Sequence, residues 1–268
     1  MKGRLRKPRR LAHNRPRNLT RQPTARGKET KGENRLASTK PIALIGEYDP
    51  TFQPHISTST AIEHSRALLP ADIEGVWVST EEIDDSLFQR YSAIWVAPGS
   101  PYKNMRKTLW AIRTARENLI PCFGTCGGFQ HLVIEYARNV LGFKDAQHAE
   151  YDPDASDLFI SQLACSLAGR KMSLTFSRGS QIAAIYGADA ATEQYYCQFG
   201  VNPDCVPLLK NGPLKVTGSD SEGEIRVIEL PGHPFFIGTL FVPQTRSRPE
   251  APHPLVTAFL KAAIESPA

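Results

Sequence analysis

One cysteine of the chain stands in a sequence context that favours nucleophilic chemistry. Cys126 follows an apolar run that ends at Gly124, and a helical pattern begins directly after Gly127 and Gly128. A sharp strand-to-helix turn of this kind lifts a nucleophile above the edge of a sheet, and glycines beside it tolerate the strained backbone. The helix N-terminus favours the thiolate and offers free N–H groups to an oxyanion. We therefore predict a nucleophile elbow at Cys126; the alternative, a buried structural cysteine, is our interpretation of Cys122, inside the apolar run.

The elements that would position this turn alternate along the chain. Apolar and amphipathic runs predict, in order, strand 42–46, helix 58–69, strand 73–78, strand 93–97, helix 105–118, strand 121–124 and helix 129–140. Short strands separated by helices of about a dozen residues are typical of parallel sheets with crossover helices. Ligand sites of such sheets lie at the carboxyl ends of the strands. The turn at 98–101 and Cys126 would both lie at that edge.

The second half of the chain is richer in strands. The pattern predicts strands 171–176, 195–201, 214–218, 225–230 and 236–242 and a final helix over 254–264. We therefore predict one α/β domain over residues 41–268, with a mostly parallel sheet flanked by helices.

The first 40 residues differ in charge from this domain. They hold 14 of the 32 Lys/Arg residues and two acidic residues, which leaves 18 Lys/Arg against 25 Asp/Glu in the remainder. So few of them are apolar that they cannot bury enough surface to offset their ordering entropy. We predict that 1–40 is a disordered basic tail. Its charge suits a contact with nucleic acid or another acidic surface, and the alternatives are a solvated extension or an upstream start codon.

Composition and motifs indicate which cellular compartment and which cofactors to expect. The five cysteines form no CxxC pair, which is typical of reduced cytosolic thiols. No run reaches the roughly 18 apolar residues of a membrane span, and Arg9–Arg10 is not followed by the apolar segment of a secretory signal. We expect a cytoplasmic protein without membrane contact. Since no metal-ligand or P-loop pattern occurs, we also expect no metal and no cofactor.

The body resembles the glutaminase domain of CTP synthase, a class I glutamine amidotransferase with a flavodoxin-like fold. The most specific stretches are Ile134–Gly142, Glu229–Gly238, Ser247–Pro249, Pro254–Leu255 and Lys261–Ala263. The resemblance covers nearly all of 41–268 and implies hydrolysis of glutamine to glutamate and ammonia by a Cys–His–Glu triad. In the full enzyme a separate synthetase domain uses the ammonia to aminate UTP. Residues 1–40 are too short for such a domain, so the chain resembles a stand-alone, divergent relative of the CTP synthase C-terminal region.

The resemblance assigns roles to residues around the elbow. Cys126 matches the nucleophile and Gly127 the residue whose N–H completes the oxyanion hole, where the family usually has a leucine. Gln130 matches a glutamine-contacting residue of the elbow helix, and Gly128 lies beside it on the substrate side. Glu150 matches the carboxylate that contacts the α-amino group of the substrate.

The oxyanion loop is only partly kept. Pro98–Gly99 matches the start of the family's Pro-Gly-Gly loop, which assigns Gly99 to the oxyanion hole. Ser100–Pro101 replaces the Gly and Phe that follow, and this places Ser100 beside the substrate.

Three other positions depart from the family. In the closing motif Phe-His-Pro-Glu-Phe-Lys-Ser-Arg-Pro, the catalytic His corresponds to Val242 and the Glu that orients it to Gln244. The Arg that holds the substrate carboxylate corresponds to Gln198. Valine carries no transferable proton, and loss of the Arg removes a charge-assisted contact worth about 1.5–3 kcal/mol.

Another histidine would have to replace the missing base. His148, two residues before Glu150, and His55, in the loop after the first strand, are the first candidates. His131 lies five residues after Cys126 on the same helix and is turned about 140° away. We interpret the remaining candidates as structural or solvated: His64, His233 and His253.

Three functions follow from these residues. The first is a divergent cysteine enzyme that acts on glutamine or a related amide, or that reacts with thiols or peroxides, and is not an ordinary glutaminase. The second is a glutaminase subunit that supplies ammonia to a synthetase partner for UTP amination in pyrimidine biosynthesis. The third is a non-catalytic binding or regulatory module.

Overall fold

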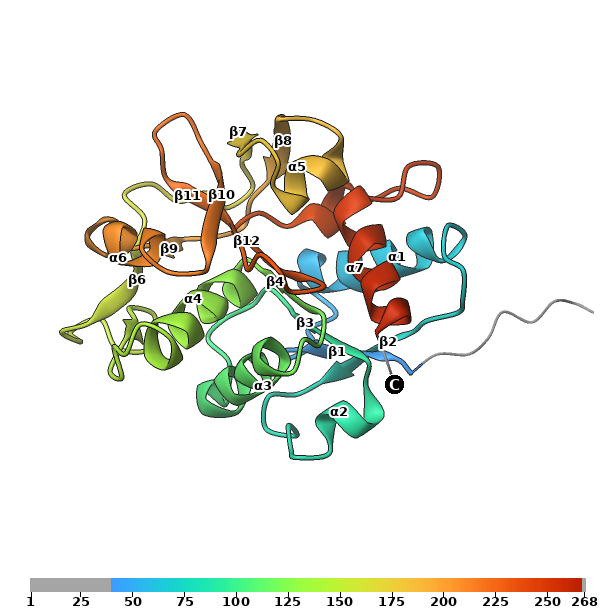
Figure 1. Ribbon diagram of the computed structural model, residues 1–268, viewed down its shortest axis with the longest axis horizontal. Coiled ribbons are helices and arrows are strands. Elements are labelled where there is room, and N and C mark those ends of the chain that lie inside the picture. Colours follow the sequence, from blue (N-terminus) through green and yellow to red (C-terminus); the bar gives the residue numbers. More distant parts are fainter. Residues whose placement is uncertain (1–39, 267–268) are drawn as a thin grey trace, which may run out of the picture. The chain divides into compact units, whose positions relative to one another are not determined.

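The computed structural model describes residues 40–266, which contain two sheets (Figure 1). The larger has nine strands in the order β2-β1-β3-β4-β12-β11-β10-β7-β8, and the smaller has three in the order β5-β6-β9. The tail expected over 1–40 lies outside the described residues except for Lys40, so its disorder and its nucleic-acid contact stay predictions.

Five neighbouring strands of the larger sheet are parallel: β2 (Gly75–Val78), β1 (Ile42–Ile45), β3 (Ala93–Val96), β4 (Cys122–Thr125) and β12 (Phe236–Thr239). All residues of β1, β3, β4 and β12 are buried, which explains their continuous apolar runs. In the register, Val96 pairs with Gly124 and Thr125 with Thr239. The carboxyl ends of β3, β4 and β12 therefore meet at one edge, as the sequence predicts.

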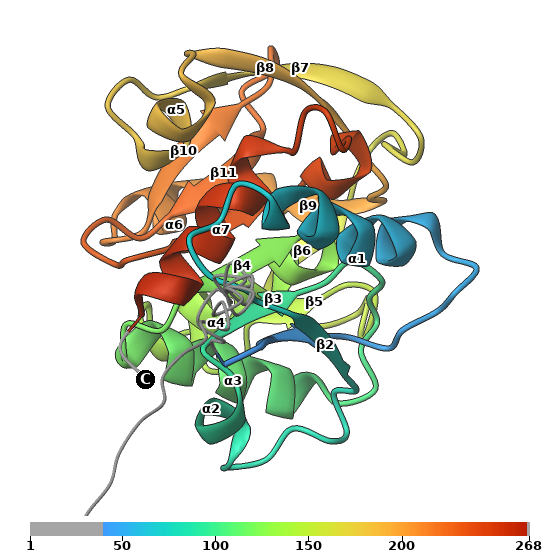
Figure 2. The ribbon, with the colours of Figure 1, turned by 90° about the vertical axis from the view of Figure 1, so that its right-hand side faces the viewer.

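Antiparallel strands extend the larger sheet: β11 (Ile225–Glu229), β10 (Lys215–Ser219), β7 (Lys171–Phe176) and β8 (Ala190–Gln194). The smaller sheet consists of β5 (Gln147–His148), β6 (Leu158–Gln162) and β9 (Phe199–Val201). Figure 2 shows β7 and β8 at one end of the larger sheet, and β2 and α2 toward the other. The predicted α/β class is confirmed.

Two pairs of helices flank the parallel strands: α1 (Gln53–Arg66) with α7 (Pro254–Glu265), and α3 (Met105–Glu117) with α4 (Gly127–Asn139). In Figure 1 strands β1, β3 and β4 lie between the two pairs. The shorter helices are α2 (Leu87–Arg90), α5 (Gln181–Tyr186), η1 (Pro203–Cys205), α6 (Val206–Lys210) and η2 (Pro243–Arg246). None of the helices within 40–266 is long and apolar enough to cross a membrane.

The predicted strand over 195–201 is wrong for 195–198 and right for 199–201, which form β9. Strand β8 ends at Gln194 and β9 begins at Phe199, so the intervening residues cross from the larger sheet to the smaller. Their backbone groups bond to a loop instead of a strand: Tyr195 N–H donates to Arg170 O, and Cys197 O accepts from Leu167 N–H. An apolar run indicates burial both in a strand and in a buried crossing segment, so it does not distinguish the two.

Two other predicted elements have different bounds. The strand expected over 236–242 ends at Thr239, and η2 follows it. The helix expected over 58–69 begins at Gln53, since the ring of Pro54 suits the first turn of a helix.

Helix α4 starts in close contact with the sheet. A Cβ atom added at Gly128 would lie 2.0 Å from Val96 O, and one added at Gly124 would lie 2.8 Å from Gly128 O. Any side chain at residue 128 would therefore push the helix away from β3. Glycine at this position permits the approach that fixes the start of α4.

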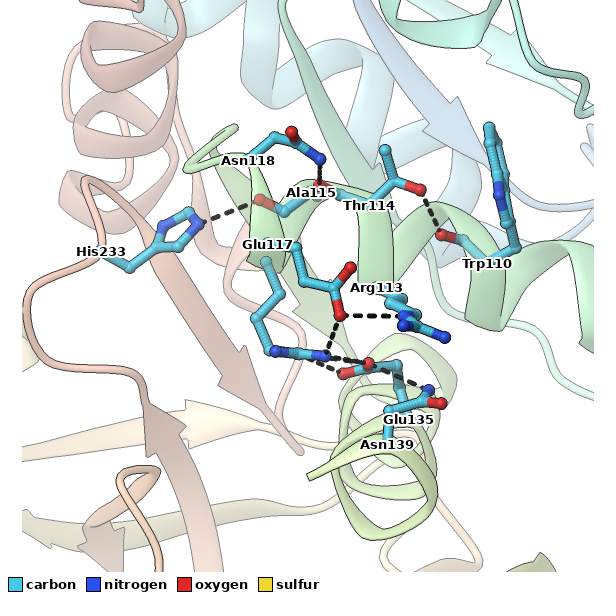
Figure 3. A network of polar contacts seen from close by, with 10 residues as sticks. Trp110, Arg113, Thr114, Ala115, Glu117, Asn118, Glu135, Asn139 and His233 are labelled. Carbon is cyan, nitrogen blue, oxygen red and sulfur yellow. Dashed lines mark hydrogen bonds and ion pairs between the residues drawn. The ribbon is translucent and has the colours of Figure 1, made fainter. Parts of the chain in front are cut away.

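An ion pair holds the other end of α4 to α3 (Figure 3). Arg116 on α3 donates through Nε and Nη2 to the carboxylate of Glu135, which is fully buried, at 2.8–3.2 Å. Asn139 donates to the same carboxylate at 3.2 Å. The pair is bidentate, so it fixes orientation as well as distance. Both ends of α4 are thus positioned by specific contacts.

The Gly128 contact predicts a large effect of one methyl group. Gly128→Ala is expected to lower the free energy of unfolding by about 3 kcal/mol, because the new Cβ overlaps a backbone oxygen. Gly127→Ala is the matched control: its Cβ would lie 3.1 Å from Ser100, which costs about 1 kcal/mol. Urea denaturation of both variants measures the difference, and equal losses would contradict the close approach.

Candidate functional site

Cys126 occupies the turn between β4 and α4. Its backbone angles are φ 52° and ψ −107°, and its N–H donates to Thr239 O at 2.9 Å. A non-glycine residue in so sparsely populated a region costs on the order of 1–3 kcal/mol and persists only where its surroundings enforce it. The predicted elbow is therefore present in the backbone. The residue is only 8% exposed, so its thiol faces a confined space.

The loop after β3 lies against the start of α4. Gly99 has φ 99°, a conformation that favours glycine. A Cβ atom at Gly127 would lie 3.1 Å from the backbone N, the Cβ and the Oγ of Ser100. The structure thus brings together the residues predicted for the oxyanion hole. A leucine at 127, usual in the family, would have to displace Ser100.

His55 holds this loop through a hydrogen bond to its backbone. Its Nδ1 accepts from Asp49 N–H at 2.9 Å, so the proton lies on Nε2, which donates to Pro98 O at 2.8 Å. Burial lowers the pKa of His55 below its usual value. Both ring nitrogens are engaged, and the neutral ring positions the loop instead of carrying protons.

Gln130, the predicted substrate contact, is engaged within the protein. Its Oε1 accepts from His148 Nε2 at 2.9 Å and from Ser100 Oγ at 3.4 Å, and its Nε2 donates to Phe199 O at 2.9 Å. The side chain links α4 to the smaller sheet. Both lone pairs of Oε1 are engaged, so a substrate could use only the second N–H of Nε2 without replacing one of these bonds.

His148 and His131 are both neutral in the folded state. Glu150 N–H donates to His148 Nδ1 at 3.0 Å, which leaves the proton on Nε2. His131 Nδ1 lies 2.7 Å from Gly127 O and must donate to it, so Nε2 accepts from Tyr151 OH at 2.9 Å. Burial lowers the pKa of His131 to about 4 and that of His148 to about 3. Neither ring has a free nitrogen for a proton shuttle.

Glu150 has an open acceptor. Burial raises the pKa of its carboxyl group, and a hydrogen bond from Ser100 opposes that rise. Among the described residues, no partner reaches its buried Oε2. A carboxylate oxygen in this position suits an ammonium group, as the resemblance implies.

The residues that the resemblance aligns with the triad His and Glu make contacts away from Cys126. Val242 is fully buried, and its N–H donates to Gln194 O at 2.8 Å. Gln244 Nε2 donates to Thr58 Oγ1 on α1 at 3.1 Å. Gln198 is exposed, and the structure does not bring it into the buried cluster. None of the three supplies a base or a cation next to Cys126.

Sequence reasoning missed Cys197, which lies beside Cys126. The two thiols interact with each other, and Cys197 Sγ donates its proton to Leu240 O at 3.0 Å. Cys197 belongs to the segment that crosses between the sheets, whose path the strand prediction placed wrongly. No spacing signal in the sequence joins the two cysteines. Within 40–266 there is also no group of three or more side chains able to hold a metal ion.

A comparison with known families agrees with the fold. The family model for glutamine amidotransferase class-I matches residues 54–262. The chain belongs to the class I glutamine amidotransferases. Within that family it is similar to CTP synthases: it is 34% identical over 236 residues to the enzyme of Cytophaga hutchinsonii and 33% identical over 236 residues to that of Sulfurisphaera tokodaii. These matches cover 83% of the chain but 44% of each relative, so the chain spans less than half the length of these curated relatives.

Solved structures support the same fold. The glutaminase domain of Trypanosoma brucei CTPS with bound acivicin aligns with a TM-score of 0.77 at 24% identity, over 86% of this chain and 96% of that one. A glutamine amido transferase from Methylobacillus flagellatus aligns with a TM-score of 0.52 at 14% identity, over 77% and 71% of the two chains. At these identities the likeness is evidence of architecture alone.

The two neutral histidines predict a pH dependence of stability. The unfolded chain binds protons at both below about pH 6.5, whereas the folded chain resists them until pH falls to the lowered pKa values of about 4 and about 3. The free energy of unfolding should therefore decrease as pH falls from 7 to 5, by up to about 2 kcal/mol per histidine. Urea titrations across this range measure the slope. His131→Gln should remove the contribution of His131 to this pH dependence. An unchanged pH dependence in the variant would contradict the neutral state assigned to His131.

Proposed function

We propose that this domain is a divergent class I glutamine amidotransferase that retains a reactive thiol at Cys126 but does not hydrolyse glutamine through a Cys–His–Glu triad. The observation that carries the proposal is that His55, His131 and His148 have both ring nitrogens engaged, while the residue that the resemblance aligns with the catalytic His is the buried Val242. Without a base, the thiol proton and the leaving amine have no relay.

Two residues of the site indicate the chemical class of the substrate. Glu150 keeps an unpartnered carboxylate oxygen at the place where an amino group would bind. Gln198 is exposed and uncharged where the family holds a carboxylate with Arg. A ligand with an ammonium group and without the glutamine carboxylate fits these two changes, because without the Arg a substrate carboxylate loses its charge-assisted partner.

A second candidate, ammonia supply to a synthetase partner, rests on the similarity to CTP synthases. It requires glutamine hydrolysis by this chain or a base contributed by the partner. A measurement of ammonia release from glutamine separates it from our proposal.

Restoring the missing groups should create glutaminase activity. Wild-type protein is expected to release no ammonia from glutamine above the level of Cys126→Ala. The triple variant Val242→His, Gln244→Glu, Gln198→Arg should exceed that level by about 100-fold, since a positioned general base contributes 10²–10⁴-fold. Adding Cys126→Ala to the triple variant is the control. Cysteine-dependent ammonia release by the wild-type chain would overturn the proposal in favour of a glutaminase.

Labelling by an electrophile that carries an amino group and no carboxylate tests the retained nucleophile. Mass spectrometry should find the adduct on Cys126, and excess glutamine should give no protection. Glu150→Gln should slow labelling about tenfold, because it removes a charge-assisted contact worth about 1.5–3 kcal/mol. The other four cysteines of the same chain serve as internal controls. Labelling that does not favour Cys126 would instead support a non-catalytic binding module.

A further inference from the structure

The Cys126 thiol has a second thiol as its nearest reactive neighbour. The side chains of Cys126 and Cys197 lie close enough to affect each other's protonation. Both residues are attached to consecutive carbonyls at the end of β12: Cys126 N–H donates to Thr239 O at 2.9 Å, and Cys197 Sγ donates to Leu240 O at 3.0 Å. Two separate anchors thus hold a pair of thiols side by side, on segments far apart in the chain.

The two thiols differ in their surroundings. Cys197 is 2% exposed. Its burial, first of all, and its interaction with Cys126 hold the pKa of its thiol well above the usual value. Cys197 therefore keeps its proton at neutral pH. Cys126 lies at the N-terminus of the 13-residue helix α4. The pair combines a thiol at a helix N-terminus with a buried thiol that keeps its proton.

We propose that Cys126 and Cys197 form a redox pair that reduces a small hydroperoxide and is itself oxidised to a disulfide. The Cys126 thiolate attacks the distal peroxide oxygen, so the O–O bond breaks and a sulfenic acid forms. The alkoxide that leaves takes the proton of Cys197. The resulting Cys197 thiolate attacks the sulfenic sulfur, the S–S bond forms, and the hydroxide released takes a proton from solvent. Overall, two thiols and one hydroperoxide give one disulfide, one alcohol and one water.

This chemistry uses the groups that the site has and does not need those it lacks. Attack on a peroxide requires a thiolate and one proton for the leaving oxygen, and Cys197 supplies that proton. It requires no histidine, no acid to orient one and no cation for a carboxylate. The inference is independent of the amide chemistry proposed above, since oxidation can be measured without any amide substrate.

The test uses the full, reduced chain and one equivalent of tert-butyl hydroperoxide, followed by alkylation and trypsin digestion. Two of the five cysteines should become protected from alkylation, and peptide 117–138 should be linked to peptide 179–210. Each peptide holds two cysteines, so Cys122→Ser and Cys205→Ser are matched controls that should keep the link. Cys126→Ser and Cys197→Ser should abolish it, and Cys197→Ser should instead accumulate a dimedone-reactive sulfenic acid at Cys126.

Several results would overturn the inference. They are a link that survives Cys197→Ser, a link that disappears in Cys205→Ser, and a wild-type Cys126 that remains reduced or proceeds to the sulfinic acid. Serine keeps a donor for Leu240 O, and circular dichroism establishes whether each variant is folded. If a serine variant at 126 or 197 does not fold, the wild-type link and the two control variants still identify the bonded pair by elimination.

Discussion

The contact between the first turn of α4 and the end of β3 positions the turn that carries Cys126. A glycine at residue 128 allows the helix to approach Val96 O, where a Cβ would lie at 2.0 Å. This approach forces the strained backbone at Cys126, directs the helix N-terminus at the thiol and brings Gly127 against Ser100. The buried pair of Arg116 and Glu135 fixes the same helix farther along. The elbow is therefore a property of packing and not of the cysteine alone.

The sequence predicted the parallel half of the sheet well, since buried strands there are apolar runs bounded by glycine and helical patterns. It failed at 195–198, where an apolar segment crosses between two sheets and takes its hydrogen bonds from a loop. It also missed elements such as β6 and α5, of five and six residues, because so few positions carry little periodicity. Long-range packing, which periodicity does not encode, decided these cases.

The site was also predicted only in part. The sequence predicts the elbow and its glycines, because local backbone geometry dictates the residue types there. It does not predict the hydrogen bonds of the histidines: Gln130 and Glu150 occupy the ring nitrogens of His148, and Pro98 accepts from His55. Cys197 reaches Cys126 only because the crossing segment and β12 lie side by side. Contacts between distant segments therefore changed the chemistry inferred for a local motif.

The packing of Ser100 on Gly127 has an evolutionary consequence. Ser100 occupies the space beside residue 127, with a virtual Cβ only 3.1 Å away. A leucine could enter at 127 only after the loop has withdrawn, whereas a loop that withdraws first leaves a void beside a glycine. The residues at 100 and 127 are therefore expected to be epistatic, because the side chain that position 127 accepts depends on where the loop at Ser100 lies.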